Sequence, residues 1–94
     1  MIDFKKVDGK DVGDIKIFAL STCTWCKKTK SFLADHDIAY SYIDVDLVPD
    51  GEVDEVRKEQ FRYNPQGSFP TIIVNGGSDV IIGFDEPKLE KLVN

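Results

Sequence analysis

Residues that could cross-link the chain or bind a metal are scarce in this sequence. The 94 residues include two cysteines and a single histidine, His36. A structural zinc site takes four ligands, usually cysteine and histidine, so a complete site would need carboxylates or a second chain. Without a secretion signal a structural disulfide is not expected either, because cytosolic thiols are kept reduced. The cysteine pair therefore favours redox chemistry over a structural role.

Basic runs and long apolar segments are also missing. The net charge of −5 and the lack of a basic run argue against a nucleic-acid partner, since nothing could neutralise a row of phosphates. No segment approaches the ~18 apolar residues of a membrane helix, and residues 1–6 lack the apolar core of a signal peptide. We therefore expect a cytoplasmic protein with no membrane partner.

The composition is that of a folded globular protein. Hydrophobic residues make up 41% of the chain and charged residues 31%, a balance that disordered chains do not share. A length of 94 residues is enough to bury one core and leaves no room for a second. We expect a single domain over residues 1–94, and a monomer.

The two cysteines are spaced as Cys23-Thr24-Trp25-Cys26, between two segments of different periodicity. Residues 15–20 are nearly all apolar, as in a strand buried on both faces. Residues 25–35 repeat their buried-type positions at helical spacing. The first cysteine therefore lies at a helix N-terminus, where free N–H groups and the helix dipole favour a thiolate. Because a thiolate is the attacking species in disulfide exchange, the motif supplies a nucleophile and a resolving partner.

The rest of the chain alternates between strand and helix patterns. A helix is predicted at 50–63 with Asp50 as its candidate cap, and Asp85 caps a last short helix. The segment Asn75-Gly76-Gly77-Ser78 is typical of a hairpin turn. Further strands are predicted at residues 2–7, 39–46, 71–74 and 80–82. The predicted order is β-α-β-α-β-β-α, preceded by an extra N-terminal strand.

Together these residues resemble a glutaredoxin. The resemblance rests on Cys23-Thr24-Trp25-Cys26, on Phe69-Pro70-Thr71 at the entry to a strand, and on Gly83-Phe84-Asp85 before the last helix. It implies an α/β thioredoxin fold at residues 15–94, with a four-stranded mixed sheet flanked by three helices. Residues 1–14 then form an N-terminal extension with a short extra strand. The resemblance also implies a cis Phe69–Pro70 peptide beside the dithiol, which proline allows at ~0.5–1 kcal/mol.

Departures from the family pattern bear on the substrate. Many glutathione-using glutaredoxins carry a lysine three residues before the first cysteine, which binds a glutathione carboxylate, and this chain has Leu20 there. Thr24-Trp25 replaces the family's usual Pro-Tyr. Asp85 matches the family aspartate that takes the other end of glutathione. Gly83-Phe84 is similar to the glutaredoxins that donate electrons to ribonucleotide reductase. Glutathione or another thiol reductant is therefore implied as a co-substrate, with no bound cofactor, and protein disulfides as the preferred substrates.

The expected mechanism is dithiol–disulfide exchange with a disulfide-bearing protein, driven by a thiol or reductase electron donor. Cys23 attacks the substrate disulfide, and Cys26 then resolves the mixed disulfide. Phe69 would offer its backbone N–H and C=O to an extended substrate segment, as in strand addition. Lys27 and Lys28 are expected to favour the Cys23 thiolate further. The predicted substrate-binding residues are Thr24, Trp25, Phe69, Pro70, Gly83, Phe84 and Asp85.

Other interpretations of these residues stay open at this point. Lys27 and Lys28 could simply be solvated, Trp25 could pack against its own domain, and Asp85 could be only a helix cap. The cysteines could hold zinc or an iron–sulfur cluster between subunits, or merely pack in an interaction module. His36 is expected at the surface, near a helix C-terminus.

Overall fold

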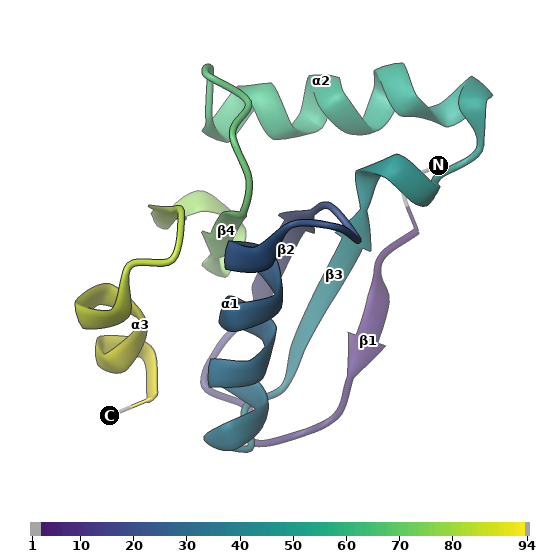
Figure 1. Ribbon diagram of the computed structural model, residues 1–94. Helices are drawn as coiled ribbons and strands as arrows, with labels where there is room; N and C mark the ends of the chain where they lie inside the picture. The colour runs from purple at the N-terminus through teal and green to yellow at the C-terminus, as the bar shows by residue number, and fades with distance from the viewer. Residues whose placement is uncertain (1–2, 94) are drawn as a thin grey trace.

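Five strands form one mixed sheet in the computed structural model, which describes residues 3–93 (Figure 1). The strands are β1 (Lys5–Val7), β2 (Ile15–Ala19), β3 (Tyr40–Asp44), β4 (Thr71–Val74) and β5 (Asp79–Ile82). Their order is β1-β3-β2-β4-β5; β2 and β3 run parallel, and the other neighbours are antiparallel. The predicted four-stranded mixed sheet is confirmed as β2 to β5, and β1 is the extra strand at the β3 edge.

Helices cover both faces of this sheet. The side-chain alternation of β2 decides which helix lies on which face, since successive residues point to opposite sides. Ile17 lies in one buried cluster with residues from the first and third helices, whereas Phe18 lies in another with Val56 of the second helix. Figure 1 shows the second helix lying apart from the other two. The helices are α1 (Thr24–Asp35), α2 (Val53–Tyr63) and α3 (Glu86–Val93).

Several predicted boundaries are wrong by a few residues. The predicted strand at 39–46 ends at Asp44, because Val45–Leu47 forms a 3-10 turn. The predicted helix at 50–63 becomes α-helical only at Val53, after a 3-10 turn over Asp50–Glu52. Asp50 is therefore not the cap of α2, whose N-cap residue makes no side-chain capping bond. A glycine within this turn disfavours regular helix. Residue 2 of the predicted first strand lies outside the described residues.

The hairpin and the last helix begin as predicted. Asn75–Gly77 joins β4 to β5, with Gly76 at φ 72°, in the left-handed region that glycine adopts without steric cost. Asp85 caps α3: its Oδ1 accepts the Lys88 N–H at 3.2 Å, and its carbonyl accepts the Leu89 N–H at 2.9 Å. Within residues 3–93, no helix has the length and hydropathy needed to cross a membrane.

Candidate active site

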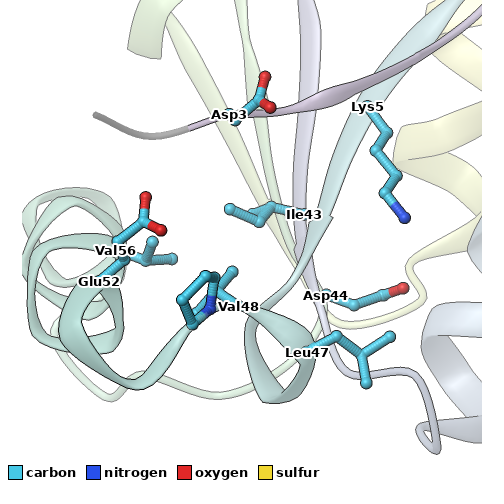
Figure 2. Close-up of a pocket in the computed structure, with 9 residues that line it drawn as sticks. Asp3, Lys5, Ile43, Asp44, Leu47, Val48, Glu52 and Val56 are labelled. Carbon is cyan, nitrogen blue, oxygen red and sulfur yellow. The ribbon is translucent and has the colours of Figure 1, made fainter.

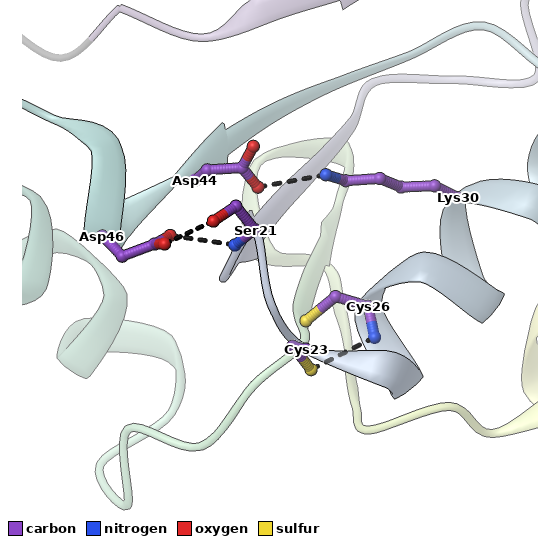
Figure 3. A network of polar contacts seen from close by, with 6 residues as sticks. All are labelled: Ser21, Cys23, Cys26, Lys30, Asp44 and Asp46. Carbon is purple, nitrogen blue, oxygen red and sulfur yellow. Dashed lines mark hydrogen bonds and ion pairs between the residues drawn. The ribbon is translucent and has the colours of Figure 1, made fainter.

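The cysteine pair lies where β2 passes into α1. Cys23 is the N-cap of α1, with extended backbone angles, and its sulfur accepts the Cys26 N–H at 3.2 Å (Figure 3). Its own N–H donates to the Leu20 carbonyl at 3.1 Å, which fixes the turn. Cys23 is partly exposed, whereas Cys26 is fully buried, and both are free thiols. One sulfur is thus accessible to a substrate, and the other lies one turn deeper in the core.

Burial sets the ionisation of the inner thiol. It raises the pKa of Cys26 from 9.0 to about 12, and the contact with Cys23 acts in the same direction. The positive charge of Lys30 lowers the pKa of Cys26 and so opposes these causes. Since a thiol is a poor nucleophile and a thiolate a good one, Cys26 stays unreactive while Cys23 is free.

Two carboxylates, one at the last residue of β3 and one in the 3-10 turn after it, bind residues that precede and follow the dithiol turn in the sequence (Figure 3). Lys30 of α1 pairs with Asp44, with 3.0 Å between Nζ and Oδ1, and both side chains are largely buried. Asp46 accepts hydrogen bonds from the hydroxyl and the N–H of Ser21, the latter at 2.9 Å. These bonds, that of the hydroxyl first, hold the pKa of the Asp46 carboxyl below its ordinary range. Sequence reasoning missed Lys30, Asp44 and Asp46; the one available signal was the four-residue spacing from Cys26 to Lys30.

The predicted cis peptide between Phe69 and Pro70 is confirmed. Pro70 is buried, and its carbonyl accepts the Gly83 N–H at 2.9 Å, which ties the segment before α3 to this turn. Phe69 and Phe84 pack, as Cys23 does, against the core cluster that contains Cys26. Residues from three distant parts of the sequence therefore meet around the dithiol.

A buried polar network supports the loop that precedes this proline. The Thr71 hydroxyl donates to the Ser68 carbonyl at 2.8 Å and accepts from the side-chain amides of Asn64 (2.9 Å) and Gln60 (3.2 Å). Gln60, Asn64 and Thr71 are at most 1% exposed, so these bonds are made out of reach of water. The guanidinium of Arg57 lies 5.0 Å from the Phe69 ring centre and donates to Gln60. The loop is thus held by side chains of α2.

Trp25 is neither fully solvated nor buried. It is 54% exposed, stacks on Phe84 with ring centres 6.0 Å apart, and carries the Lys28 ammonium 4.6 Å from its ring centre. Phe84 in turn meets the edge of Phe32 at 6.3 Å. Trp25 therefore packs on its own chain through Phe84, and the rest of the side chain faces outward.

Two hollows differ in their relation to the dithiol. A cavity of about 280 Å³ lies between β3 and the start of α2, and its lining, which includes Asp3, Glu52 and Leu47, contains neither cysteine (Figure 2). A second hollow of about 330 Å³ starts at Thr24, next to Cys23. Its lining residues are Thr24, Lys27, Lys28, Ser31, Phe32, Asp35 and Phe84.

In the described part of the chain, the histidine, cysteine and acidic side chains do not form a cluster that could bind a metal. Among residues 3–93, no group of three or more His, Cys, Asp or Glu is placed to hold a metal ion. His36 is exposed at the C-cap of α1, and its Nδ1 lies 2.9 Å from the Phe32 carbonyl. Its expected place at a helix C-terminus is confirmed.

A cysteine pair at the start of the helix after a central strand, with the residue before a cis proline packed against the same core cluster, defines a thioredoxin-fold dithiol protein. The chain belongs to the glutaredoxin family, whose family model matches residues 15–78. It is 34% identical over 79 residues to a glutaredoxin-like 8.6 kDa protein of the rubredoxin operon of Clostridium pasteurianum, covering 84% of this chain and 96% of that protein.

Two solved structures are similar over most of their length. Methanoredoxin of Methanosarcina acetivorans is 40% identical, with a TM-score of 0.85, and the match covers 92% of this chain and 90% of that one. The glutaredoxin of Methanosarcina mazei Go1 is 37% identical with a TM-score of 0.85, over 97% and 87% of the two chains. Membership of this family makes the protein, in general terms, a thiol–disulfide oxidoreductase. Members of the family typically use glutathione as a co-substrate.

Proposed function

We propose that this protein reduces protein disulfides through Cys23 as nucleophile and Cys26 as resolving thiol. The observation that carries the proposal is the unequal exposure of the two sulfurs at the N-terminus of α1. The Cys23 thiolate attacks one sulfur of the substrate disulfide, and the other sulfur leaves as a thiolate. Cys26 then loses its proton to solvent and attacks the Cys23 sulfur. The second substrate thiolate leaves, two electrons have passed to the substrate, and Cys23 and Cys26 are joined.

The order of the two steps follows from the environment of Cys26. In the reduced protein, burial and the adjacent Cys23 sulfur both raise the pKa of Cys26. Once the Cys23 sulfur is bound in a mixed disulfide it can carry no thiolate charge, so the electrostatic part of its effect on the pKa of Cys26 is removed. Cys26 therefore becomes easier to ionise at the stage where its attack is needed.

Substrate binding is assigned to the surroundings of the cis-proline turn. Phe69 lies just before β4, where its backbone groups suit the addition of an extended substrate segment. Pro70, Gly83 and Phe84 are proposed to contact the same segment. Thr24 and Trp25 are proposed to contact this segment from the dithiol turn. Support comes from the Gly83–Pro70 hydrogen bond and the Trp25–Phe84 stack.

Two cysteine variants test the roles of the sulfurs. Cys23→Ser is expected to abolish reduction of both a protein disulfide and a small disulfide, because no accessible nucleophile remains. Cys26→Ser is expected to accumulate a mixed disulfide with a protein substrate, visible on a non-reducing gel and by mass. A Cys23→Ser protein that keeps its activity, or a Cys26→Ser protein that turns over protein disulfides as the wild type does, contradicts this assignment.

Glutathione is proposed as a weakly held co-substrate. Leu20 occupies the place where many relatives have a carboxylate-binding lysine, and the neighbouring Ser21 holds the anionic Asp46 nearby. Asp85 and the N-terminus of α3 remain to bind the other end of glutathione. A second thiol source, such as a dithiol reductase, is therefore the better electron donor in this proposal.

Leu20→Lys tests this preference. A charge-assisted hydrogen bond is worth ~1.5–3 kcal/mol, so glutathione-dependent turnover at subsaturating glutathione should rise about tenfold or more. Val12→Lys adds the same charge on the N-terminal loop and serves as the control. The measurement compares glutathione plus its reductase with thioredoxin reductase on one protein disulfide. Efficient glutathione-dependent turnover by the wild type, with no gain in Leu20→Lys, would remove the proposed preference.

A further inference from the structure

One face of α1 lines a hollow that begins at the dithiol turn. Its residues recur at helical spacing, so they form a continuous stripe along the helix, with Phe84 as the opposite wall. The stripe runs from Thr24 to Asp35, which at 1.5 Å per residue is about 16 Å. An extended segment of about five residues spans that length. We call this hollow, lined by Thr24, Lys27, Lys28, Ser31, Phe32, Asp35 and Phe84, the α1 groove.

The charges of the α1 groove are arranged along its length. Lys27 and Lys28 lie at the dithiol end and Asp35 at the far end. The first turn of α1 carries no acidic residue. Within residues 3–93, neither lysine forms an ion pair. The chain as a whole has a net charge of −5. The positive end of the groove is therefore a local feature beside Cys23.

An apolar wall accompanies these charges. The Lys28 ammonium lies over the ring of Trp25, which stacks on Phe84 and keeps 54% of its surface exposed. Aromatic rings with an exposed face are frequent anchors for a partner's apolar side chains. The dithiol end of the groove thus offers an apolar surface and two cations that have no ion-pair partner among residues 3–93.

We propose that the α1 groove binds an acidic, extended segment of the substrate protein that flanks the reacting cysteine. A substrate carboxylate pairs with Lys27 and Lys28, and a neighbouring apolar side chain packs on Trp25 and Phe84. The inference rests on the proposed function and adds to it the class of substrate: disulfides flanked by acidic residues.

Three synthetic peptides test this selectivity. Each carries one intramolecular disulfide, and they differ only at the two positions that lie two residues before and two residues after the first cysteine, which are both Asp, both Asn or both Lys. Reduced protein, freed of reductant, is mixed with excess peptide in a single turnover. One peptide disulfide becomes two thiols while Cys23 and Cys26 form a disulfide, so no other electron donor enters. The rate of peptide thiol formation is measured by quenching and chromatography.

The wild type is expected to reduce the Asp peptide about three- to tenfold faster than the Lys peptide, the range that two exposed ion pairs allow. Raising the salt from about 25 mM to about 500 mM should remove most of this difference, because the Debye length shortens. The variant Lys27→Gln/Lys28→Gln should lose the preference, and Lys27→Glu/Lys28→Glu should reverse it. The control Lys58→Gln/Lys91→Gln removes two charges outside the groove and should keep it.

Other results overturn the inference. The inference is wrong if the wild-type protein reduces the three peptides at equal rates. It is also wrong if the rate ratio is the same in the wild type and in both groove variants. A uniform slowing of all peptides in the groove variants, with the ratio preserved, means that the lysines act on Cys23 reactivity instead of on the substrate. If the wild type reduces none of the peptides, the proposed function itself fails; reduction without preference removes this inference alone.

Discussion

Cys26 and Lys30 lie one turn apart on α1, and this spacing connects the resolving step to a fixed positive charge. The Lys30 ammonium is held by Asp44 at 3.0 Å and lies 4.1 Å from the ring centre of Tyr42. Its side chain is only 22% exposed, so solvent screens its charge less than that of a surface lysine. Lys30 thus has a fixed position from which its charge lowers the pKa of Cys26, whereas burial raises this pKa to about 12.

Lys30→Met should slow the second step of exchange and leave the first step less affected. Without the cation the pKa of Cys26 rises further, so less thiolate is present at any pH below it, and the pH dependence of resolution shifts upward. Reaction with 5,5′-dithiobis(2-nitrobenzoate) measures both steps, because one chromophore leaves on attack by Cys23 and another on attack by Cys26. We expect the second phase to slow by about two- to threefold near neutral pH, since Lys30 is the smallest of the causes that act on the pKa of Cys26.

Two further variants make this test specific. Lys30→Arg keeps the charge and should restore most of the second-phase rate, whereas Lys58→Met removes a charge from exposed α2 surface and should change neither phase. Equal second phases in the wild type and Lys30→Met, across the pH range, would show that Lys30 does not act on Cys26.

At the scale of elements, α2 and β4 are joined by the polar network that holds the loop before Pro70. Thr71→Val keeps the shape of the side chain but removes the hydroxyl that two buried amides and one carbonyl share. Buried groups left without a partner cost ~1–3 kcal/mol, so the free energy of unfolding should fall by about 2 kcal/mol in urea denaturation. The exposed Thr22→Val is the matched control. A loss as small as that of the control would mean that the remaining bonds to Ser68 satisfy both amides.

Elements with strong local patterns could be predicted from the sequence. The buried strand β2, the cysteine turn with α1 behind it, and the β4–β5 hairpin each carry their own signal: an apolar run, a helical period, or a glycine-rich turn. The start of α2 could not be placed, because Asp50 resembles a cap while the neighbouring glycine and proline disfavour regular helix there.

The polar contacts of the candidate site could not be predicted from the sequence. The contacts Lys30–Asp44 and Ser21–Asp46 join residues 14 and 25 positions apart. Both depend on the parallel register of β2 and β3, in which Ala19 lies opposite Asp44. Spacing along one helix or strand cannot report such a register, since it is fixed by the packing of the whole sheet.

At the scale of the whole molecule, the N-terminal segment adds to the core on the sheet face that lies away from the dithiol. β1 pairs with β3 at the sheet edge, and the preceding Phe4 packs against the cluster of Phe18 and Val56 beneath α2. The rings of Phe4 and Phe18 meet edge to face, with centres 5.4 Å apart and planes at 78°. The core on this face is therefore completed by residues outside the part that the family model matches.

Phe4→Ala tests whether this segment stabilises the fold independently of the site. Loss of a half-buried ring and of its edge-to-face contact should lower the free energy of unfolding by about 2 kcal/mol. Leu47→Ala, at a residue 64% exposed, should cost far less and serves as the control. Because the dithiol lies on the opposite face, the two chromophore-release phases of Phe4→Ala should match the wild type in the folded range. Unchanged stability, or altered release phases at full folding, would contradict this separation of the N-terminal segment from the dithiol chemistry.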